Sequence, residues 1–145
     1  MTEKKQINTA RKGAACERLA QKVMQAQGYS VRRSVRSVVR VRGGWISHAQ
    51  DFWGCDLMGT VEGRPLRLVQ VTSGPAVTTK RKKLMATVFP ACVVVEIWRW
   101  VVPKRPGVAL EPYFQCYVGQ EDFRLNPCLR LYPRDYGIDW RKYLG

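Results

Sequence analysis

The sequence predicts an α/β fold in a single domain, with one central mixed β-sheet flanked by helices. Stretches of helical and strand periodicity follow one another in the order helix, strands, helix, strand, which is typical of a sheet covered by helices. The chain has 145 residues and is 46% apolar, so one domain of this length can bury a sizeable core. No internal repeat or low-complexity linker divides it.

The first part of the chain predicts an arm, a helix and a strand. Residues 1–9 are mostly polar, and we expect them to form a flexible basic arm before a domain over 10–145. Apolar residues then recur at helical spacing as far as Gly28, a typical helix C-terminal cap. The β-branched residues of 29–42 alternate with arginine and predict a strand with a basic face. The turn-rich, aromatic stretch 43–54 predicts a loop.

The second part predicts a hairpin, a basic helix and a core strand. Residues 55–72 suggest two strands joined by a turn around Gly63. The stretch 73–89 begins with helix-breaking residues and continues into a short basic helix. The apolar run 91–102 is the most strand-like of all. Trp98 and its neighbours favour a central core strand, with a dimer interface as the second interpretation. Short strands and loops are expected after it.

The charge indicates a polyanionic partner. The chain has 25 lysines and arginines against 11 acids, a net charge of +14. A folded domain this basic typically binds nucleic acid, because each phosphate contact releases counterions. The charge is also clustered, with 11 basic residues and two acids between residues 1 and 42 and a second cluster, KRKK, at 80–83. A solvated basic face without a partner is the alternative.

Other features argue against several classes of protein. The apolar runs are too short to span a bilayer, and the start has no stretch suited to a signal peptide. We therefore expect a cytoplasmic protein, or one of the host cytoplasm if a phage encodes it, with no membrane partner. The five cysteines contain no CxxC pair, which favours reduced, mostly buried thiols over a zinc site or disulfides.

Three polar residues occur where apolar residues would be expected. Glu17 lies beside the apolar positions of the first helix, Asp56 begins a strand, and Gln70 lies between two valines. A hairpin could bring Asp56 near Gln70, and Thr72 would point to the same side as Gln70. Their oxygens and the Val71 carbonyl would suit Mg²⁺ or Mn²⁺, which in a basic cleft would serve phosphodiester hydrolysis. The simpler interpretations are that Glu17 is a solvated helix acid, that Asp56 caps a turn and that Gln70 is an exposed edge residue.

Two blocks of sequence resemble a known nuclease family. Residues 12–37, KGAACERLAQKVMQAQGYSVRRSVRS, contain a Lys-Gly pair, a Glu-Arg four residues on, a helix ending in Gly plus an aromatic, and a strand through Arg-Ser to a further Ser. This resembles the opening of archaeal-type Holliday junction resolvases, in the PD-(D/E)XK nuclease superfamily. Residues 56–74 are similar to the family's second block, an acid, a hairpin and an (E/Q)-x-K strand.

The resemblance implies a restriction-endonuclease-like sheet and roles for individual residues. Glu17 would be a helix acid that helps to bind the metal, Asp56 its bridging ligand, and Gln70 the replacement for a second acid. Ser37 would contact the scissile region of the DNA. Contacts with DNA phosphates would come from Lys12, Arg18, Arg33, Arg36, Lys80, Arg81, Lys82 and Lys83.

The sequence departs from the family pattern at the proposed site. Thr72 stands where the family has a lysine that positions or activates the attacking water. Lys80, Lys82 or Lys83 could reach back to replace it, or metal-bound water could act alone. The segment before Asp56 is longer than in the archaeal proteins and contains the only histidine, His48, for which a structural role is favoured over general-base catalysis.

We therefore expect a Mg²⁺-dependent endonuclease that resolves four-way DNA junctions by paired phosphodiester cleavage. A homodimer would match the two-fold symmetry of the junction, and recognition would use phosphates and shape. Two alternatives stay open. One is a non-catalytic DNA-binding module on the same fold, and the other is a nuclease of the same superfamily that acts on other DNA substrates.

Overall fold

The computed structural model describes residues 2–74, 77–107, 110–119, 123 and 125–144. It describes only the backbone of residues 2–10, 35–41, 45–50 and 125–128. The elements are, in chain order, α1 (Thr2–Ala26), β1 (Ser30–Arg33), β2 (Val35–Val41), β3 (Gly44–Gln50), β4 (Leu57–Thr60), β5 (Leu66–Thr72), α2 (Val77–Met85), β6 (Val93–Val101), β7 (Tyr113–Val118), β8 (Leu125–Leu131), the 3-10 helix η1 (Pro133–Tyr136) and α3 (Arg141–Leu144).

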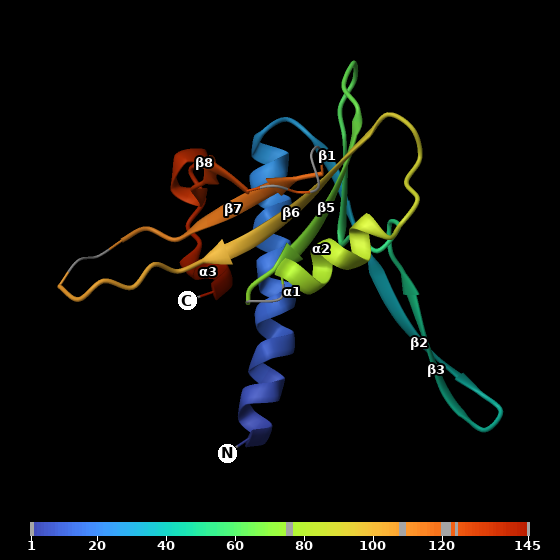
Figure 1. The fold of residues 1–145 in the computed structure, drawn as a ribbon. Helices are drawn as coiled ribbons and strands as arrows, with labels where there is room; N and C mark the ends of the chain where they lie inside the picture. The colour runs from blue at the N-terminus through green and yellow to red at the C-terminus, as the bar shows by residue number, and fades with distance from the viewer. Residues whose placement is uncertain (1, 75–76, 108–109, 120–122, 124, 145) are drawn as a thin grey trace.

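Six strands form the central sheet, in the order β1-β4-β5-β6-β7-β8. The pair β5 and β6 is parallel, and the other neighbours are antiparallel. Because parallel strands need a crossover, the chain passes through α2 between β5 and β6 (Figure 1). This confirms the predicted α/β class, with a mixed sheet and flanking helices.

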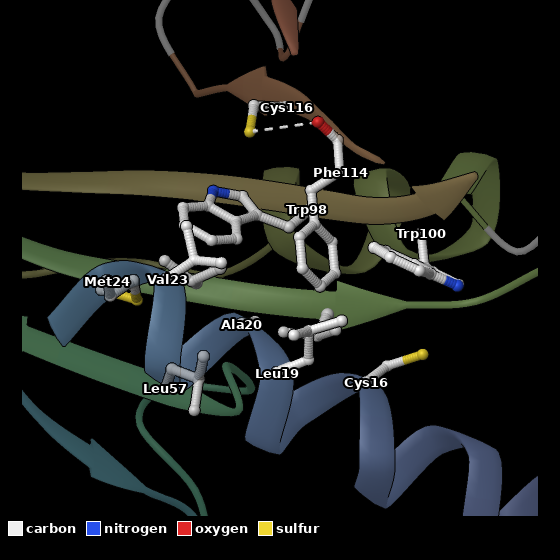
Figure 2. Packing of buried hydrophobic residues seen from close by; sticks show 12 residues of the cluster. Cys16, Leu19, Ala20, Val23, Met24, Leu57, Trp98, Trp100, Phe114 and Cys116 are labelled. Atoms are coloured by element: carbon white, nitrogen blue, oxygen red, sulfur yellow. Dashed lines mark hydrogen bonds between the residues drawn. The ribbon is translucent and has the colours of Figure 1, made fainter. Parts of the chain in front are cut away.

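The two faces of the sheet bury different helices. On one face, α1 packs against alternate residues of the central strands, and Figure 2 shows its side chains Leu19 and Val23 beside Trp98 and Phe114. On the other face, Leu84 of α2 joins a second buried cluster that includes residues of β5 and β6. Successive side chains of a strand point to opposite faces, so the residues of β5 and β6 divide cleanly between the two clusters. We call these the α1 face and the α2 face.

The first helix is longer than the sequence predicts. It begins at Thr2, so residues 2–9, which we expected as a flexible arm, are helical, and Figure 1 shows these first turns extending beyond the sheet. It ends as predicted, because Gly28 adopts a φ of 99°, a conformation that glycine reaches without steric cost. Within the described part of the chain, no helix is both long and apolar enough to cross a membrane.

The prediction of a loop over 43–54 is wrong for most of that segment. Residues 44–50 form β3, which pairs with β2 in a separate two-stranded sheet. Gly43, with a φ of 92°, makes the tight turn between them possible. The single strand predicted over 29–42 is in fact β1 and β2, which separate at Ser34. Figure 1 shows the β2–β3 hairpin projecting away from the central sheet.

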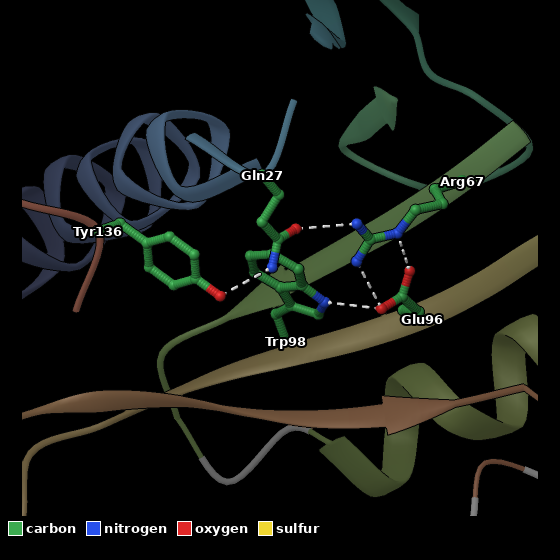
Figure 3. A network of polar contacts seen from close by, with 5 residues as sticks. All are labelled: Gln27, Arg67, Glu96, Trp98 and Tyr136. Carbon is green, nitrogen blue, oxygen red and sulfur yellow. Dashed lines mark hydrogen bonds and ion pairs between the residues drawn. The ribbon is translucent and has the colours of Figure 1, made fainter. Parts of the chain in front are cut away.

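A polar network lies inside the α1 face. The Arg67 guanidinium of β5 forms two bonds with the Glu96 carboxylate of β6, with Nε to Oε2 at 2.6 Å and Nη2 to Oε1 at 2.9 Å. Gln27 accepts from Arg67 at 2.9 Å and donates to the hydroxyl of Tyr136 at 3.1 Å, and Trp98 donates to Glu96 at 3.2 Å (Figure 3). The network thereby links the end of α1, two central strands and η1.

Candidate acid–amide site at the end of the central sheet

The β4–β5 hairpin brings Asp56 and Gln70 together. Asp56 directly precedes β4, and Gln70 is near the end of β5 and only 7% exposed. The Gln70 amide Nε2 donates to Asp56 Oδ2 at 2.9 Å. The backbone N–H of Val71 donates to the same oxygen, also at 2.9 Å. Asp56 and Gln70 thus form an acid–amide pair, as the spacing of the two residues predicts.

Backbone hydrogen bonds on both sides hold Asp56 in position. Its N–H donates to the carbonyl of Val69 at 3.0 Å. Val69 is the register partner of Leu57, so this bond lies one residue out of the β4–β5 register. The carbonyl of Asp56 accepts from the N–H of Ser34 at 2.7 Å, at the point where β1 and β2 separate. The break in the predicted strand over 29–42 therefore contributes to the site, because it supplies a donor that fixes Asp56.

The donor atoms of this pair fit a hard divalent cation in type. They comprise the Asp56 carboxylate, the Gln70 amide oxygen and the Val71 carbonyl, and Mg²⁺ and Mn²⁺ prefer such oxygens. The N–H and C=O of a strand residue point to the same neighbouring strand, so the Val71 carbonyl lies on the Asp56 side of β5. The pair includes one carboxylate, however, and no group of three histidine, cysteine or acidic residues suited to a metal occurs among the described residues.

Glu17 lies on the other face of the sheet. Its carboxylate Oε2 is 3.5 Å from Arg33 Nη2 of β1, and both side chains are about a quarter to a third exposed. Arg33 pairs in register with Leu57, which belongs to the α1 face. Glu17 and Arg33 therefore form an ion pair on the α1 face, whereas the acid–amide pair belongs to the opposite face at the same end of the sheet.

Apart from Arg33 of β1, which is paired with Glu17, the predicted DNA-contacting residues lie on α1, α2 and β2. Lys12 and Arg18 are exposed on α1. On α2, Lys82 and Lys83 are exposed, and Lys80 and Arg81 are half-buried. Arg36 and Ser37 lie on β2, where the side chains are outside the described residues, as is that of His48 on β3.

Burial keeps the thiol next to the acid–amide pair neutral. Cys55 is fully buried, and this burial, with a smaller effect of the neighbouring Asp56 and Asp51 charges, raises its pKa to about 12. It packs in the same cluster as Leu84 of α2. Cys55 is therefore a core residue and not a nucleophile.

Arg99 of β6 is a candidate site residue that we did not expect from the sequence. In the parallel β5–β6 pair, Arg99 is the register partner of Thr72, which is 7% exposed. The sequence does contain a signal for Arg99, in the alternation IWRW at 97–100. This alternation puts an arginine at an inward position of a strand whose other residues are mostly apolar. Its significance depended on the register with β5.

Comparison with known proteins gives no match, whether with protein-family models, with curated proteins or with solved structures.

Proposed function

We propose that this protein is a Mg²⁺-dependent endonuclease that cleaves DNA at four-way junctions and works as a homodimer. The observation that carries the proposal is the Asp56 carboxylate held by the Gln70 side chain and the Val71 peptide at the end of the β4–β5 hairpin. The resemblance of this hairpin and of residues 12–37 to junction resolvases supports it, as does the net charge of +14.

In this proposal, the chain's own residues orient the metal ligands. Asp56, the amide oxygen of Gln70 and the Val71 carbonyl would hold the ion, which when bound lowers the pKa of a water molecule and offsets charge on the phosphate. The Gln70 amide nitrogen fixes the rotamer of Asp56 through the 2.9 Å hydrogen bond. The exposed lysines and arginine on α1 and α2 would bind the DNA backbone without reading its sequence.

Substrate choice and oligomeric state belong to the same proposal. A four-way junction has two-fold symmetry, and a dimer with an isologous interface places two identical sites about one axis. Two such sites would make the paired cuts that resolve the junction.

A non-catalytic DNA-binding protein is the competing function, and two observations favour it. Glu17 is paired with Arg33, and the family's lysine position is occupied by a neutral residue, Thr72. A site with a single carboxylate holds a divalent cation more weakly than a site with two.

Cleavage of a labelled four-way junction and of a matched linear duplex, in Mg²⁺, Mn²⁺ or EDTA, tests the proposal. We expect Asp56→Asn to lower the cleavage rate by at least about 10²-fold, because it removes the charge that binds the ion but keeps an oxygen that can accept from Val71. Junction binding should change little. Glu62→Gln is the matched control, since Glu62 is an exposed acid in the turn of the same hairpin.

The outcomes separate the candidate functions. Symmetric, metal-dependent cuts in the junction alone support a resolvase, whereas equal cutting of the duplex indicates a nuclease with other substrates. Tight binding with no cuts in any metal indicates a DNA-binding protein. Cleavage by Asp56→Asn at the wild-type rate would contradict the role of the acid–amide pair.

A further inference from the structure

Arg99 and Thr72 are neighbours across the parallel β5–β6 pair. The register aligns Gln70 with Ile97 and Thr72 with Arg99. Ile97 belongs to the buried cluster of the α2 face, and side chains two residues apart on a strand share a face. Gln70, Thr72 and Arg99 therefore line the same face, with Arg99 one strand further from Asp56.

The Arg99 side chain has an unsatisfied donor. Its Nε atom is inaccessible to solvent and has no hydrogen-bond partner among the described residues. Buried N–H groups without an acceptor are rare in folded proteins, because burial removes the water that would otherwise accept from them. The buried Nε cannot itself reach a DNA phosphate, so a phosphate contact would come from the terminal Nη groups, whose planar arrangement fits that anion. Arg99 lies on the face of the sheet that carries Gln70 and Thr72, where such a contact would be next to the candidate phosphodiesterase site.

Of the lysines expected to replace the family's lysine, Lys82 and Lys83 are less suited to this position than Arg99. Lys82 and Lys83 are exposed in the last turn of the helix, and the Lys83 side chain lies against Gly54, in the turn before Asp56. A catalytic cation must be held in a fixed place, and a residue on a central strand is held more rigidly than an exposed one at a helix end. Arg99, on β6, meets this condition.

We infer that Arg99 supplies the cation of the cleavage site, donating to the non-bridging oxygens of the scissile phosphate as negative charge builds on them. The inference rests on the proposed nuclease function and assigns it one further catalytic residue. Thr72, at the family's lysine position, is then a neutral neighbour of a cation that has moved to the next strand. The positive charge is retained on the same face of the sheet, one strand away.

The test uses Arg99→Met, which removes the charge but keeps a long side chain suited to a buried position. We expect junction cleavage in Mg²⁺ under single-turnover conditions to be slower by about 10²–10³-fold. Junction binding, measured in EDTA over a range of salt, should show a log–log salt slope that is shallower by about one unit. The control is Arg105→Met, because Arg105 is an exposed arginine in the loop beyond β6. The double variant Thr72→Lys/Arg99→Met should recover part of the cleavage rate.

Each outcome decides the inference. A folded Arg99→Met that cleaves within threefold of the wild-type rate overturns the inference. Slow cleavage by Arg99→Met with an unchanged salt slope also overturns it, because that result would indicate a structural role for Arg99. If melting curves show that Arg99→Met does not fold, Arg99→Lys is measured. This variant keeps the charge and should cleave at close to the wild-type rate, whereas Arg99→Gln keeps hydrogen-bond donors without the charge and should be slower. A folded Arg99→Gln that cleaves as fast as Arg99→Lys would overturn the inference. Absence of cleavage by the wild-type protein would instead refute the proposed function, and the role of Arg99 with it.

Discussion

At the scale of single residues, the buried thiols are the groups whose protonation is tied to folding. Cys116 of β7 is fully buried in the same cluster as Trp98 and Phe114. Burial, with a smaller contribution from the Glu96 charge, raises its pKa above the ordinary 9.0. In the unfolded chain the same thiol ionises near pH 9. Above that pH the unfolded state therefore binds fewer protons than the folded state, and stability falls as pH rises.

Replacing Cys116 by alanine should flatten the loss of stability at alkaline pH. The thiol contributes a loss of up to about 1.4 kcal/mol per pH unit above pH 9, and Cys116→Ala cannot make this contribution, although its cavity lowers stability at every pH. Urea unfolding of both proteins at pH 8, 9 and 10 measures the slopes. Cys92→Ala, which removes an exposed thiol, is measured beside it as a comparison. Equal slopes for all three proteins would contradict this account.

At the scale of elements, the network around Arg67 and Glu96 holds together parts of the fold that are distant in sequence. The side chain of Arg67 is 14% exposed and that of Glu96 is 6% exposed. The guanidinium also lies 4.7 Å from the centre of the Tyr29 ring and 5.6 Å from that of Trp98. Burying two charges is unfavourable unless both are paired and hydrogen-bonded. Here Gln27 accepts a further bond from Arg67, and Trp98 donates one to Glu96.

Glu96→Gln should lower the free energy of unfolding by about 3–5 kcal/mol. The amide keeps the size of the side chain but leaves the buried Arg67 guanidinium without a counter-charge. Denaturant unfolding followed by tryptophan fluorescence measures the change. Glu111→Gln is the matched control, because Glu111 forms an ion pair at the surface. Its Oε1 lies 4.0 Å from Nη1 of Arg134, whose side chain is 70% exposed. A surface pair of this kind contributes less than about 1 kcal/mol to stability. A loss for Glu96→Gln as small as that of the control would argue against the network.

At the scale of the whole molecule, basic side chains emerge from both helical layers. Lys12 and Arg18 are exposed on α1, and Lys82 and Lys83 on α2. Phosphate contacts from such residues would supply most of the affinity for DNA and little of its specificity. Cleavage and affinity should therefore be separable, since the acid–amide pair belongs to the strands and the basic clusters belong to the helices.

Replacing Lys80, Arg81, Lys82 and Lys83 by alanine should weaken DNA binding for every sequence. The slope of log affinity against log salt should fall by about one unit for each phosphate group that the variant no longer binds. Fluorescence anisotropy over a range of salt measures the slope, and circular dichroism checks that α2 persists, because basic residues in its last turn also favour the helix. Alanine at the exposed Lys104 and Arg105 is the control. An unchanged slope would remove α2 from the DNA interface.

The sequence by itself determined the features that depend on local periodicity and turn residues. Three such features were predictable: the end of α1 just before its cap at Gly28, the β4–β5 hairpin with its turn at Gly63, and the core strand β6. The pairing of Asp56 with Gln70 was predictable for the same reason, because the ends of a short hairpin can meet in few ways.

Tertiary structure alone decided the features that depend on register between distant segments. Residues 44–50 form a strand only because β2 is available as its partner, and their aromatic and turn-forming residues conceal this. The partner of Arg67 and the neighbour of Thr72 are both on β6, which a helical crossover separates from β5. No local pattern encodes the alignment of two parallel strands joined in this way, because it is set by how both strands pack against the helices on the two faces.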